Sequence, residues 1–175
     1  MSDNELLSRL RDGDKEALSI IIERYYEAVF RFCIYMLQKE SDAYDITQET
    51  FLKFIKYNRS FTYISLKGYL LTIARNLCFD YFHKGKEAVL LNENLEETQL
   101  SDKGAGILQA ENSLYLMGLL GELSLEVRET VVLRIYEEMK FKDIASMMGC
   151  TTSTAKSRYR LGIQQLRKRI SNEKI

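Results

Sequence analysis

Residues 140–170 read KFKDIASMMGCTTSTAKSRYRLGIQQLRKRI, and this stretch predicts two amphipathic helices joined by a short turn. Gly149 stands where a helix can end in a left-handed conformation, which glycine adopts without steric cost. Thr151 or Thr152 can then cap the next helix by accepting from its first free N–H groups. The second helix has an inward stripe at helical spacing, formed by Ala155, Tyr159, Gly162 or Ile163, Leu166 and Ile170.

The opposite side of this second helix is polar and cationic. It carries Ser153, Lys156, Ser157, Arg160 and Gln164. A turn, an apolar stripe and an exposed cationic face together are what a helix-turn-helix needs to present a recognition helix to the major groove. The alternative is a surface αα-hairpin whose cationic face is merely solvated.

The net charge of the chain is zero, but the charges are unevenly distributed. Residues 156–174 hold seven basic side chains against one acidic side chain, a net charge of +6. Residues 85–106 hold two basic and five acidic side chains, a net charge of −3. Because the local field decides how a surface approaches phosphate, a neutral total does not argue against a nucleic-acid partner.

Composition narrows the class of protein further. The chain has no proline, and it lacks the sustained alternation of Val, Ile and Thr that indicates strands, so we predict an all-α fold. The first ten residues show no secretory signal pattern, and the longest nearly apolar run, 114–125, is too short to span a membrane. We therefore expect a cytoplasmic protein without membrane insertion.

The cysteines and the histidine do not suggest a metal site. Cys33, Cys78 and Cys150 are far apart in the sequence, and His83 is the only histidine. We interpret the cysteines as small apolar side chains in a reducing compartment, and we expect neither metal nor cofactor.

The hydrophobic pattern predicts two helical domains. Residues 1–84 form the first, 85–107 an acidic flexible linker in which the periodicity fades, and 108–175 a second domain of four helices at about 108–120, 125–137, 141–148 and 152–171. In the first domain, helices are expected near 3–12, 14–38, 42–57 and 66–83.

The last helix of the first domain carries a second candidate surface for nucleic acid. An inward line through Leu70, Ala74 and Leu77 leaves Arg75 and Phe79 outward, with Asn76 at the edge. Aromatic, cationic and amide groups together suit an unstacked base, since they stack on it, neutralise phosphate and hydrogen-bond its edge. The alternative, weighted equally on periodicity alone, is a face that packs against the preceding helices.

Three segments resemble bacterial sigma factors of the extracytoplasmic-function type, in register and in order. They are DAYDITQETFLKFIK (42–56), GYLLTIARNLCFDYFHK (68–84) and LSLEVRETVVLRIYEEMKFKDIASMMGCTTSTAKSRYR (123–160). The resemblance implies two helical domains joined by a flexible linker. It also implies a protein that binds core RNA polymerase, directs it to promoter DNA and opens the duplex there, often under the control of an anti-sigma factor.

The resemblance assigns roles to particular residues. The helix at 42–56 is expected to dock on the clamp helices of the largest polymerase subunit through Asp45, Gln48, Glu49, Leu52 and Lys53. The segment 58–83 is expected to capture a flipped base of the minus-10 element with Phe61, Tyr63, Arg75, Asn76 and Phe79. The recognition helix is expected to read the minus-35 element with Ser153, Thr154, Lys156, Ser157, Arg158, Arg160 and Leu161, where Arg158 has an intramolecular role as an equal alternative.

The sequence departs from the family pattern at three places. Relatives usually carry tryptophan at Tyr69, where this chain retains an aromatic side chain. They commonly have Leu-Pro at Leu123-Ser124, where serine can cap the following helix equally well. Where relatives have Arg-Ala-Arg, this chain has Leu161-Gly162-Ile163. Two cations are lost there, so phosphate anchoring either weakens or shifts to Arg167, Lys168 and Arg169. Leu161 offers instead an apolar contact for a thymine methyl group.

Two other classes of function are weaker. A ligand- or phosphorylation-controlled regulator would need a sensor domain, and residues 1–84 show no βα pattern or phosphoacceptor cluster. An enzyme would need paired carboxylates, a phosphate-binding glycine loop or a Cys–His set at catalytic spacing, and none is present. We therefore expect a non-enzymatic protein without a small-molecule substrate.

Overall fold

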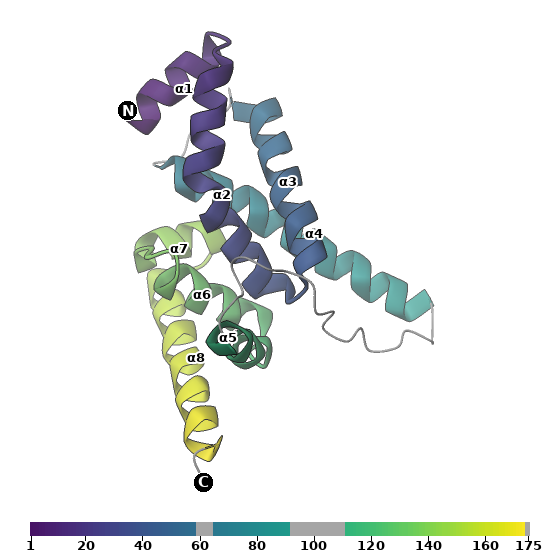
Figure 1. Ribbon diagram of the computed structural model, residues 1–175. Coiled ribbons are helices and arrows are strands. Elements are labelled where there is room, and N and C mark those ends of the chain that lie inside the picture. The colour runs from purple at the N-terminus through teal and green to yellow at the C-terminus, as the bar shows by residue number, and fades with distance from the viewer. Residues whose placement is uncertain (59–64, 92–110, 174–175) are drawn as a thin grey trace. The chain divides into compact units, whose positions relative to one another are not determined.

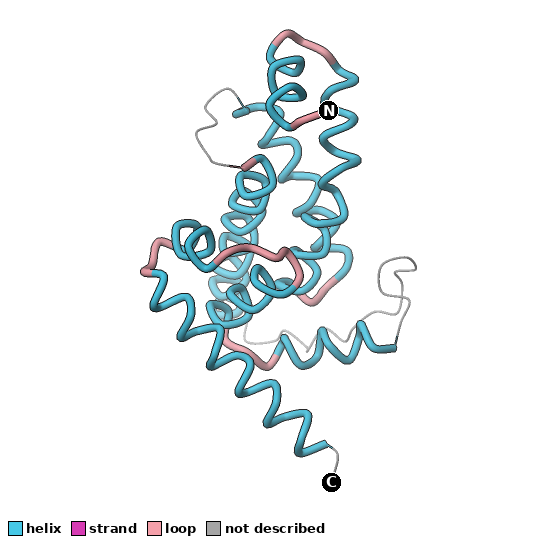
Figure 2. Tube along the Cα trace, turned by 90° about the vertical axis from the view of Figure 1, so that its left-hand side faces the viewer, coloured by secondary structure: helices cyan, strands magenta, loops and turns pink. Residues whose placement is uncertain are grey.

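The computed structural model describes residues 1–58, 65–91 and 111–173, and within them the chain is helical without any strand (Figures 1 and 2), which confirms the all-α prediction. The helices are α1 (Asp3–Arg11), α2 (Lys15–Leu37), α3 (Glu40–Tyr57), α4 (Leu66–Leu91), α5 (Glu111–Gly121), α6 (Leu125–Ile135), α7 (Phe141–Met148) and α8 (Thr152–Glu173).

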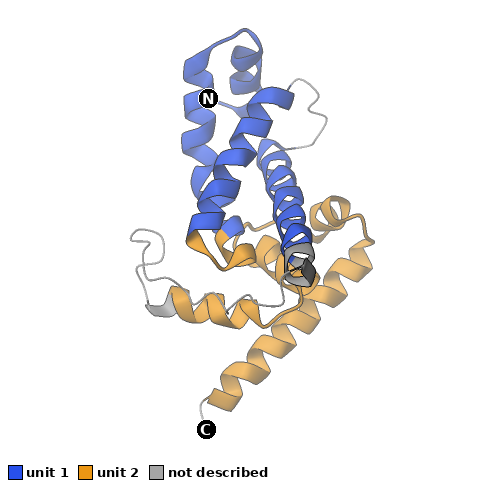
Figure 3. Ribbon diagram, turned by 90° about the vertical axis from the view of Figure 1, so that its right-hand side faces the viewer, with its two compact units in different colours: residues 1–33, 41–96 blue, residues 34–40, 97–175 orange. Residues whose placement is uncertain are grey.

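The chain divides into two compact units (Figure 3), of which the first comprises residues 1–33 and 41–96 and the second residues 34–40 and 97–175. The division into two helical units agrees with the predicted fold class. The predicted domain boundaries at residues 84 and 107 stay a prediction. Helix α4 itself continues to Leu91, eight residues beyond its expected end at residue 83.

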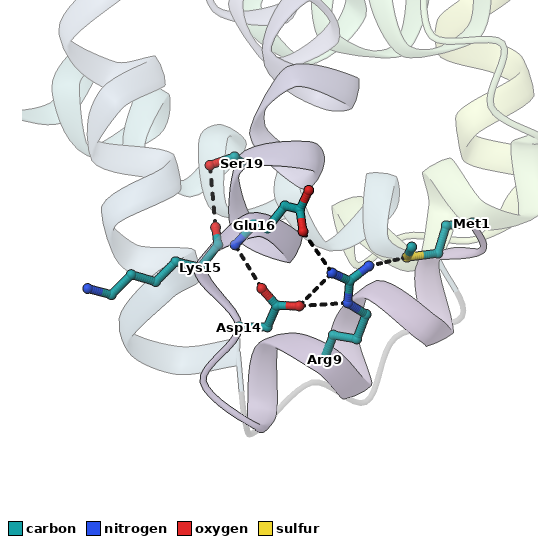
Figure 4. A network of polar contacts seen from close by, with 6 residues as sticks. All are labelled: Met1, Arg9, Asp14, Lys15, Glu16 and Ser19. Carbon is teal, nitrogen blue, oxygen red and sulfur yellow. Dashed lines mark hydrogen bonds and ion pairs between the residues drawn. The ribbon is translucent and has the colours of Figure 1, made fainter.

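The first unit begins with a helical corner. Ser2 caps α1 by accepting from the Glu5 N–H, and the Glu5 carboxylate accepts from the Ser2 N–H at 2.7 Å. After α1, Arg9 donates to the Asp14 carboxylate at 2.7 Å, and Asp14 accepts from the Glu16 N–H at 2.9 Å, as Figure 4 shows. The bond from Arg9 holds the pKa of Asp14 below its ordinary value. These bonds lie where α2 begins at Lys15, close to the start expected near residue 14.

The core of the first unit joins α2, α3 and α4. Tyr26 of α2 stacks on Phe51 of α3 with ring centroids 6.2 Å apart. Phe54 of α3 meets Tyr69 of α4 edge to face at 6.1 Å. Aromatic pairs in these arrangements add to the stabilisation from their buried area. The aromatic character that Tyr69 retains at the usual tryptophan position is therefore used in packing.

The second unit is organised around α6, whose residues 127–133 are all buried. Arg128 is only 7% exposed, and its guanidinium donates to the carbonyls of Leu120, Gly121 and Leu123 at the corner between α5 and α6. The Leu120 and Gly121 carbonyls lie in the last turn of α5, and the Leu123 carbonyl follows it. The Leu120 carbonyl also accepts from the Leu123 N–H at 3.1 Å, so the guanidinium adds donors where the α-helical bonding pattern ends.

Candidate nucleic-acid interface

The predicted helix-turn-helix is formed by α7 and α8. Gly149 ends α7 with φ of 65°, and the Cys150 N–H donates to the Ala145 carbonyl at 3.0 Å. A positive φ is the conformation that glycine adopts most readily, so the turn is closed by local chemistry. Of the two predicted caps, Thr151 is the one that accepts from the first turn of α8, with its Oγ1 3.1 Å from the Thr154 N–H.

The two faces of α8 are as the sequence predicts. Ala155 and Gly162 are buried against the rest of the unit, while Tyr159, Ile163, Leu166 and Ile170 are half-buried. The predicted polar face is exposed throughout and is made up of Ser153, Lys156, Ser157, Arg160 and Gln164. An exposed row of donors and cations on a helix that is anchored along its other side can enter a major groove.

Three other predicted contact residues of α8 lie off this row. Thr154 is half-buried, and its hydroxyl lies 2.9 Å from the hydroxyl of Thr151. Arg158 lies 3.8 Å from the Glu126 carboxylate of α6, which gives it the intramolecular partner that the sequence left open. Leu161 is 45% exposed and lines a cleft of about 280 Å³ together with Val127 and Leu166.

The cations expected to replace the lost Arg-Ala-Arg pair differ in their surroundings. Arg169 lies 3.3 Å from Glu122 and 3.5 Å from Glu173, so its charge is already balanced within the unit. Arg167 and Lys168 are exposed. These two side chains are therefore better placed than Arg169 to meet phosphate.

Three of the five predicted minus-10 residues, Arg75, Asn76 and Phe79, lie on one stretch of α4. The Arg75 guanidinium lies over the Phe79 ring, 4.6 Å from its centroid, and Asn76 is exposed beside them. Phe79, predicted to point outward, is half-buried, so its ring is less exposed than periodicity suggested. Phe61 and Tyr63 lie outside the described residues.

The outward face of α3 is mostly polar and also exposes the apolar side chains of Leu52 and Ile55. Asp45, Gln48, Glu49 and Lys53 are exposed, and Leu52 among them is 65% exposed. The buried side of the helix comprises Ala43, Thr47, Thr50, Phe51 and Phe54. Tyr57, the last residue of α3, is 49% exposed.

Sequence reasoning missed two features that support the interface. The role of Arg128 was not foreseen, although an arginine inside the apolar run of α6 was a signal. The close contact of Gly162 with α6 was also missed, since the inward position was left between Gly162 and Ile163.

Within the described ranges, no three His, Cys, Asp or Glu side chains gather in a way that could hold a metal ion. Cys33 and Cys78 are buried and Cys150 is half-buried, and no disulfide bond joins any of the three. In the same part of the chain, no helix has both the length and the apolar character that crossing a membrane requires.

Two family models match the chain, sigma-70 region 2 over residues 21–87 and sigma-70 region 4 over residues 113–166. The first contains α3 with most of α2 and α4, and the second contains α7 with most of α8. Together the two matches define a sigma-70-type transcription factor.

Individual relatives narrow this class. The chain is 28% identical to the ECF RNA polymerase sigma factor BldN of Streptomyces coelicolor, over 83% of this chain and 57% of BldN. It is also 28% identical to the ECF RNA polymerase sigma factor SigM of Bacillus subtilis, over 78% of this chain and 85% of SigM. The chain thus spans little more than half the length of BldN.

A solved structure of a sigma factor also matches this chain. The sigma factor RpoE of Bartonella quintana, co-crystallised with the anti-sigma factor NepR, matches with a TM-score of 0.73 at 25% identity, over 86% of this chain and 94% of that one. The chain therefore belongs to the extracytoplasmic-function type of sigma factors. Sigma factors are transcription initiation factors rather than enzymes.

Proposed function

We propose that this chain binds core RNA polymerase, reads the minus-35 element of its promoters with α8, and opens the minus-10 element by capturing a flipped base on α4. One observation carries this proposal: α8 of the helix-turn-helix exposes Lys156, Ser157 and Arg160 in one row, in a chain that belongs to the sigma factors. Holding both DNA surfaces on one polymerase allows two weak contacts to act together.

The minus-35 reading is supported by the chemistry of the exposed row. Arginine and lysine donate to guanine O6 and N7, and serine accepts or donates to several base edges. Arg160→Ala should reduce discrimination among minus-35 variants by about 1–3 kcal/mol. Arg167→Ala, which removes an exposed cation lower on α8, should weaken all promoters alike.

These two variants can be compared by in vitro transcription with core polymerase on promoters that differ at single minus-35 bases. If Arg160→Ala leaves the ranking of those promoters unchanged, Arg160 does not contact a base.

The minus-10 opening is supported by Asn76, Arg75 and Phe79, which offer an amide, a cation and a ring on one stretch of α4. Binding an unstacked base offsets the few kcal/mol that unpairing costs. Asn76→Ala should therefore reduce strand opening, detected by permanganate reactivity of thymines, more than it reduces promoter association.

The matched control for this experiment is Asp80→Ala, since Asp80 is also an exposed polar side chain on α4. Equal losses of opening and of association in the Asn76 variant would remove the proposed role.

The exposed face of α3 is the proposed polymerase contact. Leu52, 65% exposed among Asp45, Gln48, Glu49 and Lys53, gives this face an apolar centre with a polar rim, which is the usual composition of a protein interface. Because RpoE was crystallised with an anti-sigma factor, we propose that a protein of that class also holds this chain inactive.

A further inference from the structure

Gly162 lies where α8 packs most closely on α6. A Cβ atom built on Gly162 would lie 2.5 Å from Cγ2 of Val131 and 2.9 Å from Cγ1 of Val127. Carbon contacts under 3.0 Å are essentially never seen, and ordinary van der Waals contact begins at 3.4 Å. Helix α8 therefore approaches α6 more closely than any residue with a side chain at position 162 would permit.

The two valines have little freedom to move away. Val131 is 1% exposed and Val127 is 6% exposed, so both are enclosed by neighbouring atoms. Valine is also branched at Cβ and has restricted rotamers. A side chain at position 162 would consequently displace α8 rather than the valines. Restoring a 3.4 Å contact to Val131 from 2.5 Å requires a movement of about 0.9 Å.

The beginning of α8 is held independently of Gly162. Thr151 caps its first turn, Ala155 is fully buried, and Arg158 pairs with Glu126 of α6. A displacement at residue 162 would therefore act as a swing about the region of Ala155. At a rise of about 1.5 Å per residue, position 162 lies about 10 Å from that pivot and Arg160 about 7.5 Å from it.

This swing affects the reading residues unequally. Arg160 would move by about 0.6 Å, which exceeds the tolerance of about 0.5 Å for a productive binding geometry. Lys156, one residue from Ala155, would hardly move. Adding a single methyl group at position 162 thus separates the two basic side chains of the exposed row.

We propose that Gly162 is a positioning residue for promoter recognition: without a side chain, it lets α8 lie close enough to α6 for Arg160 to reach its base. This inference rests on the proposed minus-35 reading by α8. It also gives the departure from the family's Arg-Ala-Arg pattern a physical meaning, since alanine at the middle position does not fit here.

The test measures sequence preference base by base. Transcription with core polymerase is measured on a promoter mapped for the wild-type chain and on all its single-base minus-35 variants. The losses of preference in Arg160→Ala and Lys156→Ala first identify the base position that each side chain reads. Gly162→Ala, Val131→Ala and the double variant Val131→Ala/Gly162→Ala are then compared with the wild type, and circular dichroism melting of each protein reports its folding.

Gly162→Ala should lower the preference at the Arg160 position at least about fivefold and the preference at the Lys156 position by less than about twofold. The double variant should recover at least half of the lost preference on a logarithmic scale, because it removes the 2.5 Å contact and keeps the 2.9 Å contact. Val131→Ala alone should keep the wild-type preference at both positions. A purely structural role for Gly162 would not distinguish the two base positions.

Unchanged preference at the Arg160 position in Gly162→Ala, or equal losses at both positions, would overturn the inference. If Gly162→Ala does not fold, the folded double variant decides by the same comparison, and a double variant that does not fold overturns the geometric basis. A wild-type chain without any minus-35 preference would instead refute the proposed function, and with it this inference. Failure of the inference alone leaves the wild-type preference intact.

Discussion

Replacing Arg128 by methionine tests how the second unit is held together. Methionine has a similar length and no donors, so the change removes the hydrogen bonds while it keeps most of the packing. Within this unit the guanidinium donates to the carbonyls of Met36 at 2.7 Å, Leu120 at 2.8 Å, Gly121 at 2.9 Å and Leu123 at 3.3 Å. Burial lowers the pKa of Arg128 from its ordinary value, which shows that the site also disfavours the charge that it holds.

The expected loss follows from these opposing effects. Each hydrogen bond contributes about 1 kcal/mol net, or about 4 kcal/mol for the four accepting carbonyls. Removing a buried charge recovers part of its desolvation cost, whereas leaving carbonyls without donors adds a further cost. We expect Arg128→Met to lower the stability of this unit by about 3–4 kcal/mol.

Hydrogen exchange measured by mass spectrometry is the suitable assay, because it reports the opening free energy of peptides from 113–135 separately from the first unit. Arg167→Met is the matched control, since it makes the same chemical change at an exposed position of α8. If the opening free energy of these peptides in Arg128→Met is within about 0.5 kcal/mol of the wild-type value, the carbonyl contacts do not stabilise the corner.

Three further predictions concern the cap of α8, the contact between α3 and α4, and the polymerase face. Thr151→Ala removes the acceptor 3.1 Å from the Thr154 N–H and should lower exchange protection at the start of α8 by about 1 kcal/mol, while Thr152→Ala should have little effect. Burial, together with the hydrogen bond that Tyr81 donates to Asp42, raises the pKa of Tyr81 to about 12. Because the pKa of Tyr81 is higher in the folded chain than in the unfolded chain, the protonated phenol stabilises the fold. This stabilisation is complete below about pH 10 and is lost as the pH rises through about 12. When tyrosine absorbance is followed at alkaline pH, Tyr81→Phe should therefore have one fewer phenol that ionises near pH 12 than the wild type has. Glu49→Lys should weaken binding to core polymerase at least about tenfold, or 1.4 kcal/mol, while the same change at the exposed Glu23 of α2 should not; equal binding by the two variants would exclude Glu49 from the interface.

Local chemistry explains which parts of the fold could be predicted. Gly149 and Thr151 fix the turn through backbone conformation and a side-chain cap, and both are visible in the sequence. The faces of α8 follow from residue spacing alone. The end of α4 was placed too early because fading periodicity was taken as the end of the helix. Residues 86–91, KEAVLL, contain no glycine or proline and are compatible with helix even without an amphipathic pattern.

Contacts between distant segments could not be predicted in the same way. Arg128 contacts carbonyls whose positions depend on how the chain turns between α5 and α6. The requirement for glycine at position 162 depends on the separation of α6 and α8, which no pattern within either helix specifies. Among the candidate site residues, the exposure of Lys156 and Arg160 was predictable, whereas the intramolecular pairing of Arg158 was one of two open alternatives.

Mapping of transcription start sites tests the central claim most directly. Core RNA polymerase is incubated with genomic DNA in the presence and absence of the wild-type chain, and the 5′ ends of the transcripts are sequenced. The chain should create new 5′ ends that share one sequence element about one helical turn upstream and another about three turns upstream, at the places where α4 and α8 are proposed to bind. Identical 5′ ends with and without the chain, at concentrations that saturate the polymerase, would contradict promoter-directed initiation by this protein.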